Sequence, residues 1–185
     1  ILLSICKALG PHQTLTGLDK LNSFKTLASQ VVRSQALIQM GDTAGASAAL
    51  DAAAQQTSST TVMATAVQSA LNAQRPELAL TWAAHLASAQ TGNDEAAVAL
   101  ANALRANNNH AQAATVLEDS LVAGRSPRVL NALAWLRVTA PDDALRNGLQ
   151  AEQLYEEALA AMGQPNVFLL QTRAAISAET GKIDQ

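Results

Sequence analysis

The sequence predicts an all-α protein in which antiparallel helix pairs stack as an α-solenoid, on the basis of its composition and an internal repeat. Forty of the 185 residues are alanine and only 3% are aromatic, which favours closely packed helices over a sheet. The turn residues Gly41, Gln74 and Asn108 are separated by 33 and then 34 residues. This period indicates a repeated helix pair, and we expect about nine or ten helices in one domain over residues 1–185.

The first 26 residues are expected to form an N-terminal helical segment. A short helix is predicted over residues 1–11, ending at Gly10, because glycine favours the left-handed cap. Thr16 and Asp19 are typical of a capping box at a helix start. Apolar residues then follow at spacings of three or four, which predicts one long helix over residues 17–40.

The remaining helices are predicted where an apolar periodic segment lies between turn signals. Pro76, for example, suits the first turn of a helix because its missing amide would be unpaired there. The polar run 56–60 is expected to be a loop. The expected repeats are 27–60, 61–93, 94–126 and 127–165, with a partial repeat at 166–185, and their helices span 45–55, 61–73, 76–89, 95–106, 110–123, 128–138, 149–162 and 167–180.

Superposing the repeats places small residues at the points where paired helices are expected to cross. Small side chains let two helices approach closely, and larger apolar residues beside them expose surface that only a neighbouring repeat can cover. The small residues are Ser34, Val67, Ala101, Ala134 and Ala174 in the first helices, and Ala46, Ala79, Ala113 and Ala151 in the second helices.

This pattern resembles the tetratricopeptide repeat (TPR), a helix-turn-helix unit of about 34 residues. The resemblance covers residues 27–185, with Gly41-Asp42, Gly181-Lys182 and the recurrent alanines as its main support. Residues 130–158 are similar to a terminal repeat variant of bacterial TPR proteins. The resemblance implies a right-handed superhelix whose first helices line a concave, protein-binding face. Arg33 and Arg173 depart from it, because that position is usually apolar.

Amide side chains are expected along this concave face. Amides both donate and accept hydrogen bonds, so a ladder of them can bind an extended peptide backbone without requiring a particular sequence. They are equally compatible with a simple solvated helix surface. Trp135 is a candidate aromatic anchor or a residue buried against the next repeat, whereas Trp82 is expected to pack between repeats. The candidate binding residues are Gln35, Gln39, Gln68, Asn72, Asn102, Arg105, Asn131 and Trp135.

Other classes of function have little support in the sequence. The net charge of −3, with scattered Lys and Arg, argues against nucleic acid, and no apolar run is long enough for membrane insertion. His12, His85 and His110 have no ligand partners at metal-binding spacing, and no catalytic or cofactor motif occurs. The lone Cys6 permits no internal disulfide and is expected to be a small buried residue.

The sequence therefore predicts a non-catalytic scaffold that binds a peptide or partner protein. Two alternatives remain open: a structural module that forms homo-oligomers through the solenoid ends, and an accessory domain of an enzyme or of a secretion or assembly machine. The chain opens on Ile1, which suggests a fragment or processed segment. Its low charge and single cysteine favour an extracytoplasmic location, although a cytoplasmic solenoid could have the same composition.

Overall fold

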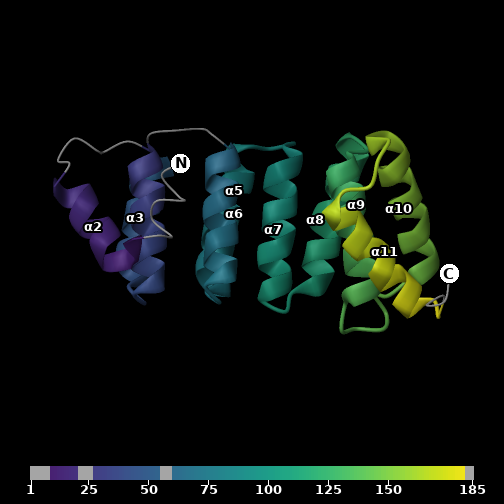
Figure 1. The fold of residues 1–185 in the computed structure, drawn as a ribbon. Coiled ribbons are helices and arrows are strands. Elements are labelled where there is room, and N and C mark those ends of the chain that lie inside the picture. Colours follow the sequence, from purple (N-terminus) through teal and green to yellow (C-terminus); the bar gives the residue numbers. More distant parts are fainter. Residues whose placement is uncertain (1–8, 21–26, 55–59, 182–185) are drawn as a thin grey trace. The chain divides into compact units, whose positions relative to one another are not determined.

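A computed structural model describes residues 9–20, 27–54 and 60–181, and every regular element in these ranges is an α-helix (Figure 1). The all-α prediction is therefore confirmed for the described residues. The helices are α2 (Pro11–Lys20), α3 (Leu27–Gln39), α4 (Thr43–Ala54), α5 (Thr60–Asn72), α6 (Pro76–Ala89), α7 (Asp94–Ala106), α8 (His110–Ala123), α9 (Pro127–Thr139), α10 (Gly148–Met162) and α11 (Val167–Glu179).

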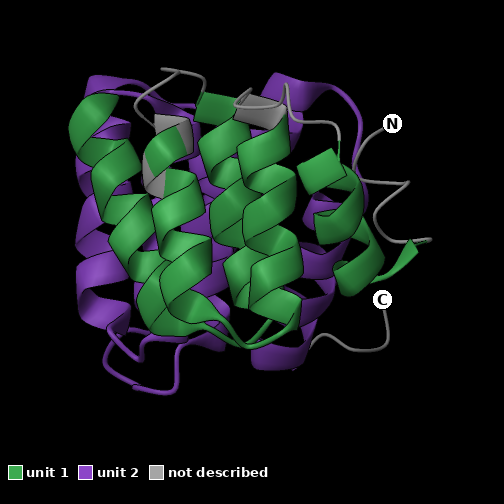
Figure 2. Cartoon of the chain, turned by 90° about the vertical axis from the view of Figure 1, so that its left-hand side faces the viewer, with its two compact units in different colours: residues 1–90 green, residues 91–185 purple. Residues whose placement is uncertain are grey.

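The helices group into two compact units, residues 1–90 and residues 91–185 (Figure 2). In the first unit, α3 pairs with α4 and α5 pairs with α6, while α3 also packs against α2 and α5. In the second unit, α7 pairs with α8 and α9 pairs with α10, while α9 also packs against α7, α8 and α11. Within each unit, the first helix of one pair therefore contacts the first helix of the next pair.

Three hairpin turns share one hydrogen-bonding pattern. Each has a residue with left-handed backbone, and the amide of the following residue donates to a carbonyl five residues earlier, which is the Schellman arrangement that ends many helices. The three left-handed residues are Gly41 (φ +83°), Gln74 (φ +57°) and Asn108 (φ +60°). The bonds run from Asp42 N to Leu37 O (2.9 Å), Arg75 N to Ala70 O (3.0 Å) and Asn109 N to Leu104 O (2.9 Å).

The predicted helix ends agree with the structure within two residues from α4 to α11, wherever those ends are described. The largest of these differences is at the start of α4, which was expected at residue 45. The helix begins at Thr43 because the side chain of Asp42 accepts a hydrogen bond from Gly45 N (2.8 Å) and so caps the helix. The predicted loop 56–60 lies outside the described residues, apart from Thr60, which opens α5.

The predicted single helix over residues 17–40 is wrong. Helix α2 begins at Pro11, directly after left-handed Gly10, and it packs against α3 as a separate element. Thr16 is not a helix cap, because it lies inside α2 and its hydroxyl donates to His12 O (2.9 Å). Apolar periodicity misled the prediction, since a stripe spaced at three and four residues looks the same in one long helix and in two packed ones. Cys6 and the rest of the predicted 1–11 helix up to residue 8 lie outside the described residues.

Most of the small residues expected at the helix crossings lie in the core. All of those expected there are buried except Ala174 on α11, which is exposed. The largest fully buried side chains include Leu50, Leu117, Leu130 and Leu133, which fill the space beside the crossings. Alanine at a crossing lets the helix axes approach, and the neighbouring leucines supply most of the buried apolar area.

None of the helices in the described ranges is long and apolar enough to cross a membrane.

Candidate functional site

In the first unit, the candidate residue Gln35 forms a hydrogen bond to a neighbouring helix. It is half-buried on α3, and its Nε2 donates to Ser69 Oγ on α5 at 2.6 Å. Ser69 Oγ in turn donates to Thr65 O at 2.9 Å. Gln35 therefore links the first helices of consecutive pairs and keeps its Oε1 acceptor and its second N–H for another group.

The other three candidates of this unit lie at the solvent. Gln39 ends α3, Asn72 ends α5, and Gln68 lies one turn before Asn72; all three are exposed. Gln68 Nε2 donates to Asn72 Oδ1 at 3.0 Å, which leaves Gln68 Oε1 as an acceptor and Asn72 Nδ2 as a donor. A peptide backbone offers one amide and one carbonyl at each residue, so this pair can bind both.

In the second unit, Asn102 and Arg105 lie half-buried on α7, one turn apart. Burial lowers the pKa of the Arg105 guanidinium below its usual value. Among the described residues, no acid pairs with Arg105. It also lies in the last turn of α7, where the helix dipole favours a positive charge. Arg105 is therefore a partly desolvated donor that is still able to bind an acceptor.

Asn131 and Trp135 lie one turn apart on α9, the helix that packs against α7. Both are half-buried. Asn131 Oδ1 is buried without a hydrogen-bond partner in the described structure, and a buried oxygen of this kind favours an ordered water. Trp135 keeps part of its ring at the surface, whereas Trp82 on α6 is buried, as expected for a packing residue.

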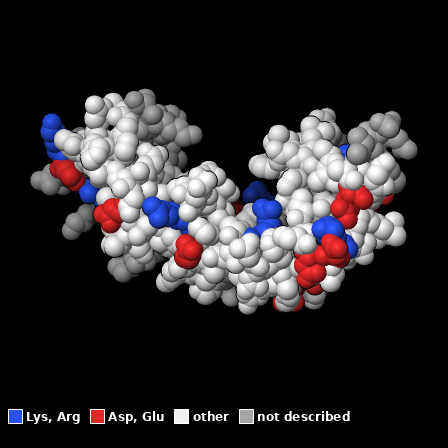
Figure 3. Space-filling model, turned by 90° about the horizontal axis from the view of Figure 1, so that it is seen from below, with Lys and Arg blue, Asp and Glu red and all other residues white. Residues whose placement is uncertain are grey.

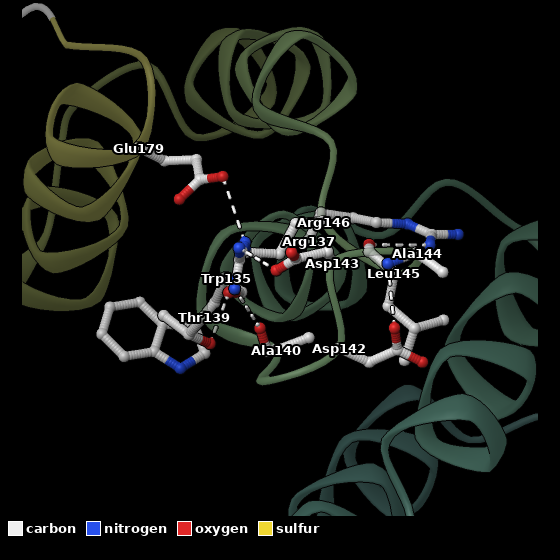
Figure 4. Close-up of polar contacts among 10 residues, drawn as sticks. All are labelled: Trp135, Arg137, Thr139, Ala140, Asp142, Asp143, Ala144, Leu145, Arg146 and Glu179. Atoms are coloured by element: carbon white, nitrogen blue, oxygen red, sulfur yellow. Dashed lines mark hydrogen bonds and ion pairs between the residues drawn. The ribbon is translucent and has the colours of Figure 1, made fainter.

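The connection between α9 and α10 contains a polar cluster that the sequence did not predict (Figure 4). Arg137 donates to Leu145 O (3.1 Å) and pairs with Glu118 of α8. Arg146 donates to Ala140 O (3.2 Å) and pairs with Asp143 of the same loop and with Glu179 of α11. The two arginines bind loop carbonyls and thereby hold the expanded turn against α8, α9 and α11. The sequence signal that could have revealed the cluster is the pair of arginines flanking the loop.

The two arginines that stand at an expected apolar position, Arg33 and Arg173, both pair with acids of the preceding helix. Arg33 on α3 pairs with Asp19 of α2, the preceding helix. Arg173 on α11 pairs with Glu152 (3.6 Å) and Glu156 (3.5 Å) of α10 and lies over the Tyr155 ring, 5.6 Å from its centroid. Each arginine therefore extends along the preceding helix to an acid instead of entering the core.

Further charges also form pairs between neighbouring elements, and on the face drawn in Figure 3 Lys and Arg lie next to Asp and Glu. Arg125 makes a two-bond pair with Glu157 of α10, in which Nη2 lies 2.6 Å from Oε2. The hydrogen bonds from Arg125 lower the pKa of Glu157 and raise that of Arg125. In the described part of the chain, no three His, Cys, Asp or Glu residues gather as a metal site.

The structure thus brings together only some of the predicted ladder. Gln68 meets Asn72, while Gln35 meets Ser69, a residue that sequence reasoning missed. Asn102 and Arg105 share α7, and Asn131 and Trp135 share the adjacent α9. No family model, curated protein or solved structure matches this chain, so its function is argued from this geometry.

Proposed function

We propose that the chain is a non-catalytic scaffold, a right-handed TPR-type solenoid that binds an extended peptide segment of a partner protein along its first helices. The observation that carries the proposal is the amide pair Gln68 and Asn72, exposed at the end of a first helix with the Gln68 Oε1 acceptor and the Asn72 Nδ2 donors unused. Hairpins of TPR length and the repeated turn geometry support the architecture.

The second unit contributes different chemistry to the proposed function. Arg105 offers a charged donor, Asn102 an amide, and Trp135 a partly exposed aromatic surface on the neighbouring helix. A partly desolvated arginine binds a carbonyl or carboxylate more strongly than a fully hydrated one, and a tryptophan is a frequent hot spot at interfaces. We therefore expect peptides that carry an apolar residue and an acceptor to be preferred over strongly basic ones.

The test starts from random peptides displayed on phage and selected on the purified chain. The selected peptides are then measured against a Gln68→Ala/Asn102→Ala double variant by fluorescence anisotropy. Each lost hydrogen bond is worth about 1 kcal/mol, so we expect Kd to rise by about fivefold to thirtyfold. Helical content and melting temperature should not change, because neither amide contributes to the buried core.

The matched control is a Gln13→Ala/Gln153→Ala double variant, which removes two exposed amides from α2 and α10. It should bind the selected peptides with unchanged Kd. Equal affinity of all three proteins would show that the first-helix amides do not contact the peptide, and the proposal would then be wrong.

A further inference from the structure

Helices α7 and α9 of the second unit begin at the same level and run in the same direction. Glu95 in the first turn of α7 pairs with Arg128 in the first turn of α9, with 3.7 Å between Oε1 and Nη1. Helix α8 returns the chain from the end of α7 to the start of α9, so the two first helices are parallel. They also pack against each other, and residues 33 positions apart in the sequence therefore lie at the same level.

Each of the two helices has a partly exposed stripe of residues spaced at three and four, which places them on one helix face. The stripe of α7 continues from Glu95, and that of α9 continues from Arg128, so the ion pair joins the two stripes at their start. Together they form what we call the α7–α9 surface. Its members beyond the ion pair are Val98, Asn102 and Arg105 on α7, and Asn131 and Trp135 on α9.

Arg105 differs from most described arginines, because they lie against an acid. The paired arginines are Arg33, Arg125, Arg128, Arg137, Arg146 and Arg173. Arg105 is half-buried and has no acid partner within the described ranges, and burial lowers the pKa of its guanidinium. Partial removal of a cation from water without a partner costs free energy. A carboxylate supplied by a ligand offsets this cost, since it forms charged hydrogen bonds with the guanidinium.

The position of Arg105 relative to Trp135 sets the spacing of the groups that a ligand must carry. Trp135 is at the level of Asn102, and Arg105 lies three residues further along α7, which is about 4.5 Å along the axis. Axes of packed helices are about 8–10 Å apart, so the two positions are separated by roughly 10 Å. An extended peptide advances about 3.3 Å per residue and covers this separation in two or three residues.

We propose that the peptide of the proposed function carries an aspartate or glutamate side chain that pairs with Arg105, and an aliphatic or aromatic residue two or three positions away that packs on Trp135. This inference rests on the proposed function and names the class of peptide that it selects. The half-buried indole supplies apolar contact area. Asn102, one turn before Arg105, lies between the two contacts and can bond the peptide backbone.

The first experiment selects random peptides displayed on phage, in parallel on the unmodified chain and on Arg105→Gln. On the unmodified chain, we expect enrichment of aspartate or glutamate two or three positions from an apolar residue. On Arg105→Gln, enrichment of the acid should disappear and that of the apolar residue should remain, because only the charged contact is removed.

The second experiment measures Kd by fluorescence anisotropy for a selected peptide with an amidated C-terminus, in which side chains hold the only carboxylates. Replacing its acid with the matching amide should raise Kd about tenfold or more on the unmodified chain and change it little on Arg105→Gln. Arg105→Glu should lose the acidic peptide and bind a version with lysine at that position. This exchange of charges reports on the pair even where a single variant alters local packing.

The matched control is Arg75→Gln, which removes the same charge from a half-buried arginine of the first unit. It should bind the acidic peptide like the unmodified chain. Equal weakening by Arg75→Gln and Arg105→Gln would indicate a general charge effect and overturn the inference.

The remaining outcomes separate this inference from the proposed function. Selected peptides without the acid would overturn the inference alone, whereas absence of any selected peptide would overturn both. A peptide that lacks the acid but regains affinity when its C-terminus is freed would assign Arg105 to a chain-terminal carboxylate and contradict the side-chain pair.

Discussion

Gln74 and Asn108 adopt left-handed backbone angles at turns where Gly41 serves the same role. A side chain in this conformation costs roughly 1–2 kcal/mol, whereas glycine adopts it freely and asparagine tolerates it better than most residues. The hydrogen bonds at the three turns are equivalent, so the turn geometry is imposed by the helix pair and does not depend on glycine. Glutamine at residue 74 therefore carries strain that the packed hairpin offsets.

Replacing Gln74 with glycine should stabilise the protein. Relief of the left-handed strain outweighs the extra chain entropy of glycine, so we expect the free energy of unfolding to rise by roughly 0.5–1 kcal/mol in urea titrations. Asn108→Gly should give a smaller increase, and Gly41→Ala should destabilise. A loss of stability in Gln74→Gly would mean that the glutamine side chain makes a contact that compensates for its strain.

Helices α9 and α11 carry a leucine at the same position of the repeat, but the two leucines differ in burial. Leu130 and Leu170 have the same spacing from a crossing alanine, yet the first is buried and the second is more than half exposed. Helix α9 packs against α7, α8, α10 and α11, whereas α11 packs mainly against α9 and α10. Burial at this repeat position is thus a property of the element that packs against it.

The two leucines should respond very differently to truncation. Leu130→Ala leaves a cavity in the core of the second unit and should cost about 2–5 kcal/mol of unfolding free energy. Leu170→Ala removes a side chain that packs little, so its effect should lie within about 0.5 kcal/mol. Thermal and urea unfolding of both variants would check this. Equal losses would mean that Leu170 is covered in solution, which would contradict its exposure in the structure.

Among the described residues, most ion pairs join neighbouring elements. Arg33 with Asp19, Arg128 with Glu95, and Arg125 with Glu157 each join two segments of the same unit. All of these side chains are at least partly exposed, and exposed pairs contribute little to stability because water and salt screen them. Buried alanine and leucine contacts therefore supply most of the stability of each unit.

Stability should consequently depend weakly on ionic strength. Between about 0.05 M and 0.5 M sodium chloride, exposed pairs are progressively screened, and we expect the free energy of unfolding to change by less than about 1 kcal/mol. Urea titrations at several salt concentrations would measure it. A loss of several kcal/mol would show that the arginine cluster around Arg137 and Arg146 contributes far more than exposed pairs usually do.

Much of the helical arrangement followed from the sequence, and the exceptions have a clear cause. From residue 41 onward, glycine, proline and polar residues mark the turns between helices. Both ends of α6 and of α8 were therefore predicted correctly. Residues 10–20 were misassigned because Gly10 and Pro11 suit a helix end and a helix start equally well. The partners of Gln35, Arg137 and Arg146 could not be predicted, because they depend on which side chains adjacent elements bring within reach.

The sequence by itself determined that the described residues are helical, where the hairpins from residue 41 onward turn, and, Ala174 apart, which small residues are buried, because these depend on local propensity and on the repeat in the sequence. Only the tertiary structure decided that Gln35 binds Ser69, that Gln68 binds Asn72, and that Leu170 is exposed while Leu130 is buried. A repeat fixes the face of a helix on which a residue lies. What covers that face is set by the neighbouring element, through contacts between residues that are distant in the sequence.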